Sequence, residues 1–246
     1  PAGGWAMIDA DAPIKRDEPT VLQVTEDGRR LSNRWWSIHI DAAGRIDEVY
    51  DQINDRHILR EGEAANEWHV FEDRPLKWDA WDIDIYATDL RLDDPALESV
   101  RVVERGDVRV AVELVWRLPE LPQGEQSVIT QRIALYAASP RIDFETRVDW
   151  HEHHKVLKVA FPVNVRATEA TCEIQFGHLT RPTHRNTSWD LAKFEICAHR
   201  FIDLSEHGFG VALLNDCKYG HDVRDNMLRL TCIKSAQAPS AVADQG

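Results

Sequence analysis

The sequence has few of the features that carry a chain to a membrane or to nucleic acid. No apolar run approaches the roughly 18 residues that a bilayer-spanning helix needs, and the first residues lack the basic and apolar regions of a secretory signal. Basic residues are also few, since 29 lysines and arginines stand against 42 aspartates and glutamates, a net charge of −13. Such a charge repels phosphate backbones and anionic lipid headgroups. We therefore expect no nucleic-acid partner, no membrane partner and a cytoplasmic location.

Cysteines and the short motifs of several catalytic classes are also scarce. The four cysteines form no CxxC pair, which argues against a zinc knuckle or a redox dithiol. We expect them to be buried free thiols of a reducing compartment: Cys172, Cys197, Cys217 and Cys232. No glycine-rich phosphate loop, no GxSxG elbow and no nucleophilic cysteine with a plausible histidine partner is present.

Short strand-like segments dominate the chain. About a dozen runs with apolar alternation are separated by Gly, Pro and Asp turns, for which we predict positions at Asp27-Gly28, Gly44, Arg105-Gly106-Asp107 and Ser139-Pro140. The later predicted strands are VLKVAFPVNV, ATCEIQFGHL, FEICAHRFIDLS, GFGVALLND and MLRLTCI. Helical periodicity is doubtful even at its best, around residues 188–192. This pattern predicts an all-β protein, a large antiparallel β-sandwich.

Two segments interrupt the strand pattern. The first, FEDRPLKWDAWDID at positions 71–84, sets aromatic residues among five carboxylates; the second, RPTHRNTSWD at positions 181–190, is polar and ends in Trp-Asp. The first cannot be a simple core strand, because its carboxylates would be buried unpaired. An ordinary solvated loop is also unexpected, because indoles are costly to expose. Function in sandwiches tends to lie on loops, so both segments are candidates.

WHEHHK at positions 150–155 is the strongest hint of a metal site in the sequence. It is not the HExxH zinc motif, whose histidines are four apart. On a strand, His151 and His153 would share one face, and a third ligand from elsewhere would be needed to hold a metal. Surface hydrogen bonding is the alternative, and we expect no metal ligand in this chain. Neighbouring carboxylates are expected by chance in so acidic a chain, so they do not establish a glycosidase acid pair.

The Trp-Asp pairs suggest sugar recognition. Sugar rings have apolar faces that lie against indoles, while their hydroxyls need acceptors such as carboxylates and donors such as arginine. Trp78, Trp81 and Trp189 are each followed by aspartate. The alternative is that these tryptophans plug the ends of the sandwich while the aspartates cap turns.

Several long strings resemble one known family: FEDRPLKWDAWDID, ALYAASPRIDFETRVDWHEHHKVLKVAFPV, EIQFGHLTRPTHRNTSWDLAKFEICAHRFIDLSEHGFGVALLNDCKYG and SAQAPSAVADQG. They resemble the C-terminal β part of glycoside hydrolase family 38 α-mannosidases of the cytosolic, vacuolar and bacterial type. The resemblance implies a galactose-mutarotase-like supersandwich over residues 20–246, truncated at both ends, preceded by a leading segment or cut linker over residues 1–19.

The resemblance also implies what lies outside this sequence. Family members carry an upstream catalytic β/α domain and a helical bundle, and these hold the nucleophilic aspartate and the His and Asp ligands of Zn. The expected role of this chain is to scaffold and complete the sugar pocket of a retaining α-mannosidase acting on terminal α-D-mannosides, with no cofactor of its own and no activity alone. Its expected partners are the upstream domains and α-mannosides or oligosaccharides. An exposed packing surface could also produce a homo-oligomer.

The resemblance and the interrupted pattern together nominate eight substrate-binding residues and no catalytic one. They are Asp73, Trp78, Asp79 and Trp81 from the first segment, and Arg181, His184, Trp189 and Asp190 from the second. Arg181 is the strongest candidate for a hydrogen bond to substrate. Two alternatives remain open: a carbohydrate-binding module, and a mutarotase-type epimerase that uses His151 or His184 as its acid.

Overall fold

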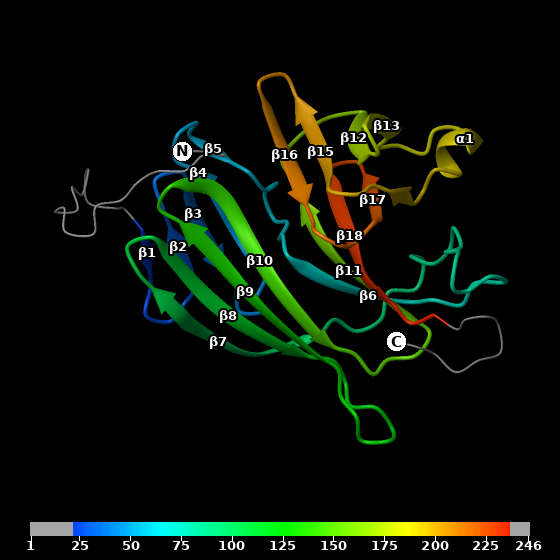
Figure 1. Ribbon diagram of the computed structural model, residues 1–246, viewed down its shortest axis with the longest axis horizontal. Helices are drawn as coiled ribbons and strands as arrows, with labels where there is room; N and C mark the ends of the chain where they lie inside the picture. The colour runs from blue at the N-terminus through cyan, green and yellow to red at the C-terminus, as the bar shows by residue number, and fades with distance from the viewer. Residues whose placement is uncertain (1–21, 237–246) are drawn as a thin grey trace.

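The computed structural model describes residues 22–236, and over this range the protein is all-β. It contains eighteen strands and one short helix, and every strand pair is antiparallel. The strands form four sheets, two of which are built from residues 23–149 and two mainly from residues 155–234 (Figure 1). No helix within residues 22–236 has the length and apolar character required to cross a membrane.

The first two sheets share the larger hydrophobic core. One is a five-stranded meander and the other a four-stranded meander, and Ile38, Trp116 and Ile133 from the two sheets are almost fully buried in one cluster. Alternating apolar residues build this core, because successive side chains of a strand point to opposite faces. The strands are β1 (Gln23–Val24), β2 (Arg30–Ser32), β3 (Trp36–Ile40), β4 (Ile46–Asp51), β5 (Arg56–His57), β7 (Ala96–Arg105), β8 (Arg109–Arg117), β9 (Val128–Tyr136) and β10 (Ser139–Asp149).

The other two sheets enclose a smaller core, in which Cys172, Ile202 and Leu228 are fully buried. Their strand orders are β14-β17-β18-β11-β6 and β13-β12-β15-β16. Strand β6 also supplies Trp68 and Val70 to the larger core, so it belongs to both halves of the molecule. The strands are β6 (Glu67–Glu72), β11 (Lys155–Pro162), β12 (Glu169–Ile174), β13 (Gly177–Pro182), β14 (Ile196–Cys197), β15 (Phe201–Glu206), β16 (Phe209–Leu214), β17 (Gly220–Arg224) and β18 (Met227–Lys234).

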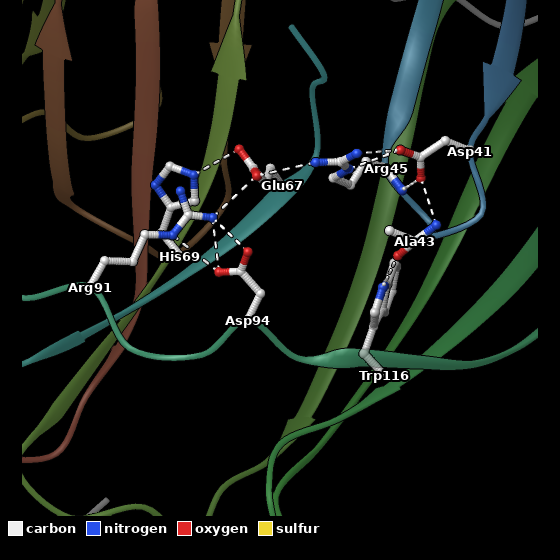
Figure 2. A network of polar contacts seen from close by, with 8 residues as sticks. All are labelled: Asp41, Ala43, Arg45, Glu67, His69, Arg91, Asp94 and Trp116. Atoms are coloured by element: carbon white, nitrogen blue, oxygen red, sulfur yellow. Dashed lines mark hydrogen bonds and ion pairs between the residues drawn. The ribbon is translucent and has the colours of Figure 1, made fainter.

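A network of charged side chains joins the first sheet to β6 (Figure 2). Glu67 accepts hydrogen bonds from His69 at 3.0 Å and from Arg91 at 3.1 Å, and Arg45 lies 3.5 Å from it. Arg45 is in turn fixed by Asp41 at the turn between β3 and β4. The hydrogen bond from His69, supported by Arg91 and opposed by burial, lowers the pKa of Glu67 to about 2. Glu67 is therefore the anionic centre that connects these elements.

The turn predictions hold at three positions and fail at one. Gly28 and Gly44 have φ of 71° and 83°, values suited to glycine, and β7 turns into β8 across Gly106. The turn placed at Ser139-Pro140 is wrong, because Pro140 lies within β10. It occupies a break in register on this edge strand, where the missing N–H of proline costs no ladder hydrogen bond.

Several strand boundaries differ from the predictions. ATCEIQFGHL is not one strand but the hairpin of β12 and β13, which turns at Phe176 with a φ of 62°. FEICAHRFIDLS is divided between β14 and β15. Strands β6 and β17 were not predicted, because charged and histidine residues obscure their alternation. The doubtful helical segment does form α1 (Ser188–Leu191).

The cysteine prediction is partly wrong. Cys172 is buried, Cys232 is half-buried, and Cys197 and Cys217 are exposed, all four as free thiols. The boundary predicted between residues 19 and 20 lies outside the described residues. The supersandwich of the mutarotase type stays a prediction.

Candidate functional site

The first segment divides between a strand and a loop. Phe71 is buried at the end of β6 and pairs with Arg91, so burial explains this aromatic residue. After Glu72 the chain leaves the sheet, and the loop of residues 73–90, here named the aromatic loop, projects between β6 and β7 (Figure 1). Residues 71–84 therefore do not form a single segment, because residues 71 and 72 still belong to β6.

Asp73 and Asp79 share one cation, Lys234 at the end of β18. The ammonium of Lys234 contacts Asp73 and lies 2.9 Å from Asp79 Oδ1. Asp73 is only 1% exposed, its backbone N–H donates to the His154 carbonyl at 2.7 Å, and its Oδ1 has no hydrogen-bond partner among the described residues. Burial raises the pKa of Asp73, although Lys234 opposes this shift. One oxygen of a buried carboxylate is thus left to accept a further donor.

The two tryptophans of the aromatic loop face solvent. Trp78 and Trp81 are 64% and 71% exposed, and their ring centroids lie 6.1 Å apart at an interplanar angle of 56°. Trp81 N–H donates to the Trp78 carbonyl at 2.8 Å, which closes a tight turn that places the two indoles together. The expectation that these indoles avoid water is wrong within this chain, and so is the alternative that they plug the end of a sandwich. Two exposed indoles side by side are an uncommon surface.

The aspartates partly follow the turn-capping alternative. Asp84 accepts hydrogen bonds from the Leu76 N–H at 2.8 Å and from the Tyr86 hydroxyl at 2.7 Å. Asp82 accepts from the Ile83 N–H at 2.9 Å. These carboxylates organise the backbone of the aromatic loop, whereas Asp73 and Asp79 connect it to β18.

Arg181 and His184 in the second segment each present a buried nitrogen that has no hydrogen-bond partner within residues 22–236. Arg181 lies on β13 opposite Ala170, and its Nε is buried. His184 follows the end of β13, and its buried Nδ1 lies 3.6 Å from Asp190, too far for a hydrogen bond. A guanidinium nitrogen always carries a proton, so Arg181 offers an unused donor.

Trp189 and Asp190 lie on α1, which Thr187 begins. Thr187 and Asp190 form a capping box, in which the Thr187 backbone N–H donates to Asp190 Oδ2 at 3.2 Å and the Thr187 hydroxyl accepts from the Asp190 N–H at 3.2 Å. Capping of this kind fixes the start of a helix. Trp189 projects from α1 with 76% of its surface exposed, while the Asp190 carboxylate is already engaged.

The structure thus forms two groups from the eight predicted residues. Asp73 and Asp79 bind Lys234 and belong to the same loop as the paired Trp78 and Trp81, and the other four lie along the end of β13 and on α1. The aromatic loop and α1, which carry most of these residues, both lie on the right of Figure 1. Sequence reasoning missed Lys234, and no local signal could have found it, because it is 155 residues from Asp79.

The shared strand face considered for His151 and His153 is absent, because these histidines follow the end of a strand. Strand β10 ends at Asp149 and β11 begins at Lys155, so the histidines lie in the connection between them. The side chain that points inward is Glu152, which accepts from the Ser127 hydroxyl at 2.9 Å and pairs with Lys155. His151 lies 3.3 Å from Asp149 near the surface. Across residues 22–236, no group of three or more His, Cys, Asp and Glu side chains is arranged to hold a metal ion.

Comparison with known proteins identifies the family. Residues 31–241 match the family described as glycosyl hydrolases family 38 C-terminal domain. The chain is 41% identical over 250 residues to alpha-mannosidase 2C1 of Homo sapiens, with 100% of this chain and 24% of that protein covered. It is also 41% identical over 218 residues to alpha-mannosidase G of Dictyostelium discoideum, covering 88% of this chain and 20% of that protein.

Solved structures agree at the level of the fold. The crystal structure of an alpha-mannosidase from Enterococcus faecalis V583 superposes with a TM-score of 0.73 at 14% identity, covering 87% of this chain and 26% of that one. The chain therefore spans about a quarter of the length of the relatives it matches. From the matched residues and the identity over its whole length, this chain belongs to the family of glycosyl hydrolases family 38 C-terminal domains.

Proposed function

We propose that this chain is the C-terminal part of a retaining α-mannosidase that hydrolyses terminal α-D-mannosides. Its role there is to scaffold the enzyme and to complete the sugar pocket, while the upstream β/α domain and helical bundle supply the reacting groups. The observation that carries this proposal is the 41% identity to a protein named alpha-mannosidase over the full chain. Retention implies two successive displacements through a glycosyl-enzyme intermediate.

The exposed groups of the two segments support a role in binding sugar. Trp78, Trp81 and Trp189 expose the flat apolar faces of their indoles, and the faces of pyranose rings stack on such surfaces. Two buried atoms, Asp73 Oδ1 as an acceptor and Arg181 Nε as a donor, have no partner within residues 22–236, and their chemistry suits the hydroxyls of a sugar that reaches them.

Zinc chemistry does not fit the residues that the structure describes, 22–236. The described side chains contain no group of three potential ligands, whereas a catalytic zinc site uses three protein ligands. We therefore assign Zn to the upstream domain of the whole enzyme and derive no step from it here. This chain should bind no stoichiometric Zn²⁺ alone.

Three further features are part of the proposal. The four sheets form a supersandwich of the galactose-mutarotase type, supported by two hydrophobic cores that share Phe161, Phe209 and Val211 and by the likeness to an α-mannosidase structure. The location is cytoplasmic, supported by four free thiols. Isolated chains associate as homo-oligomers through surfaces that normally pack on the upstream domains.

The main test compares this chain alone with the same chain joined to its upstream domains. Hydrolysis of 4-nitrophenyl α-D-mannoside should be detected only for the joined polypeptide, and NMR should show α-mannose as its first product, since retention preserves the anomer. Enzyme-like hydrolysis by the 246-residue chain alone, or β-mannose as the first product, would overturn the proposal.

Individual residues can be tested in the joined polypeptide. Trp78→Ala and Arg181→Ala should each raise KM by roughly tenfold, because stacking and charged hydrogen bonds contribute about 1–2 kcal/mol each. The matched control is Arg30→Ala, which removes an exposed ion pair with Glu48 in the first sheet and should leave KM unchanged. An equal effect of all three variants would contradict the assignment of Trp78 and Arg181 to the sugar pocket.

The exposed indole pair also favours a second candidate, a carbohydrate-binding module. In that case calorimetry on this chain alone would show tight binding of mannose and short mannosides that Trp81→Ala abolishes. We expect weak or undetectable binding, because the upstream half of the pocket is required. The epimerase alternative stays a prediction and would require interconversion of sugar anomers that is lost on replacement of His151 or His184.

A further inference from the structure

We propose that Lys234 is a positioning residue that fixes the aromatic loop, and with it the indoles of Trp78 and Trp81, against the sheet through Asp73 and Asp79. The indoles are those that the proposed function assigns to sugar, and to that extent the inference rests on it. The geometric claim concerns only how the loop is held, and it can be tested without any sugar.

Backbone hydrogen bonds hold the aromatic loop at its base. Glu72 N–H donates to the Leu90 carbonyl at 3.1 Å, and Leu92 N–H donates to Val70 at 2.8 Å. These bonds close the two ends of the loop against β6. They lie at the ends of the loop, so they do not reach the turn that carries the tryptophans.

Burial does not hold the turn that carries the tryptophans. Both indoles are mostly exposed, and Trp78 has a φ of 61°, a left-handed conformation that is unfavourable for a bulky residue. A conformation of this kind persists only where the surrounding structure determines it. The hydrogen bonds of Asp84 to Leu76 and Tyr86 organise the loop internally, but they leave its position relative to the sheet undetermined.

Lys234 stands where it can connect the turn to the sheet. It is the last residue of β18 and lies opposite Val156 on β11, which in turn lies opposite Phe71 at the end of β6. This cross-strand row places the ammonium beside the point where the chain leaves β6. Asp73 at the start of the loop and Asp79 directly after Trp78 both bind it. One cation therefore joins the sheet, the base of the loop and the turn of the indoles.

Removal of the cation would leave two carboxylates facing each other. Asp73 is almost fully buried, and a buried charge whose partner is removed is strongly destabilising. Asp84 also acts on Asp73 electrostatically and adds to the negative charge. The local relief is to move Asp79, and the adjoining Trp78, away from the sheet into water. Loss of Lys234 should thus open the aromatic loop before it affects the rest of the molecule.

The test reads the two indoles directly. The chain is labelled with 5-fluorotryptophan, and ¹⁹F NMR resonances are assigned by Trp78→Phe and Trp81→Phe. Three variants are compared: Lys234→Met, which removes the charge at similar volume; Lys234→Arg, which keeps it; and Lys77→Met, which makes the same chemical change at an exposed position within the same loop. Chymotrypsin cleavage within the aromatic loop, mapped by mass spectrometry, is measured in parallel.

Lys234→Met should shift the Trp78 and Trp81 resonances while those of the buried Trp68 and Trp116 stay in place, and cleavage in the loop should accelerate about tenfold or more. Lys234→Arg should retain the resonances of the unmodified chain. The inference is overturned if Lys234→Met leaves both resonances in place, if Lys77→Met shifts them equally, or if all four tryptophans respond together. None of these readouts involves sugar, so they are independent of the proposed function.

Discussion

Substitution of Glu67 by glutamine gives the sharpest test of the network in Figure 2. Glu67 is 20% exposed and is surrounded by His69 on its own strand, Arg91 from the segment before β7, and Arg45 from the turn between β3 and β4. Glutamine has nearly the same shape but carries no charge. Glu67→Gln therefore removes the attraction to these groups while the surrounding packing is kept.

The expected magnitude follows from the pKa of Glu67. The hydrogen bond from His69, aided by Arg91, lowers this pKa from 4.5 to about 2. Each tenfold change in proton affinity corresponds to about 1.4 kcal/mol, so the ionised carboxylate should stabilise the fold by about 3 kcal/mol at neutral pH. Because the pKa is lowered on folding, this stabilisation is complete above pH 4.5 and is lost as the pH falls toward 2.

The assay is urea unfolding of the unmodified chain and of Glu67→Gln between pH 7 and pH 2.5. The unmodified chain should be more stable by about 3 kcal/mol at pH 7, and the difference should shrink as the protonated carboxyl comes to resemble glutamine. The control is Glu26→Gln, since Glu26 is 93% exposed in its pair with Arg105, and an exposed pair is worth at most about 1 kcal/mol. A stability difference that does not change with pH would refute the electrostatic argument.

Two other predictions follow from the described residues. Gly44→Ala should destabilise the fold by about 2–4 kcal/mol, because an added Cβ would lie 2.8 Å from the Trp116 ring and the φ of Gly44 is 83°. The control is Gly62→Ala, where φ is similar but the space is open, so thermal unfolding should show a loss of only about 1 kcal/mol. Equal losses in stability for the two variants would contradict the steric argument. Thiol labelling of the folded chain at pH 8 should modify two cysteines and spare two until denaturant is added. Burial raises the pKa of Cys172 to about 11 and that of Cys232 to about 12, so these two thiols should be the spared ones. Rapid labelling of all four cysteines would contradict the burial. The reactive thiols are Cys197 and Cys217, and the spared ones are Cys172 and Cys232.

Much of the fold could be predicted from local patterns. Alternation in runs such as β8 and β9 reflects one buried face, and the turns at Gly28 and Gly44 require a φ that glycine adopts easily. The patterns failed where other forces decide the conformation. Pro140 indicates a turn locally, but an edge strand with a break in register accommodates it.

The candidate site was predictable in its residues but less so in its geometry. Unusual Trp-Asp composition pointed to both segments; the structure places most of the first on a loop, whereas the second runs from the end of β13 into α1. Composition could not show that Asp190 caps a helix while Asp73 binds a lysine, because these two roles differ only in which partner lies near the carboxylate. Exposure of the indoles was likewise unpredictable, because it depends on which surfaces the rest of the chain covers.

The amino-acid sequence by itself determined the all-β class, most of the turns and the family, since alternation, glycine conformations and long matching strings are properties of neighbouring residues. Only the tertiary structure decided which charges are buried and with which partners. Lys158 lies in an apolar strand without an acidic neighbour, yet it is fully buried between Glu195 and Asp222. Lys234 meets Asp73 and Asp79 in the same way. These pairs form between residues far apart in the chain because a charge removed from water requires an opposite charge at contact distance, and strand pairing brings the two together.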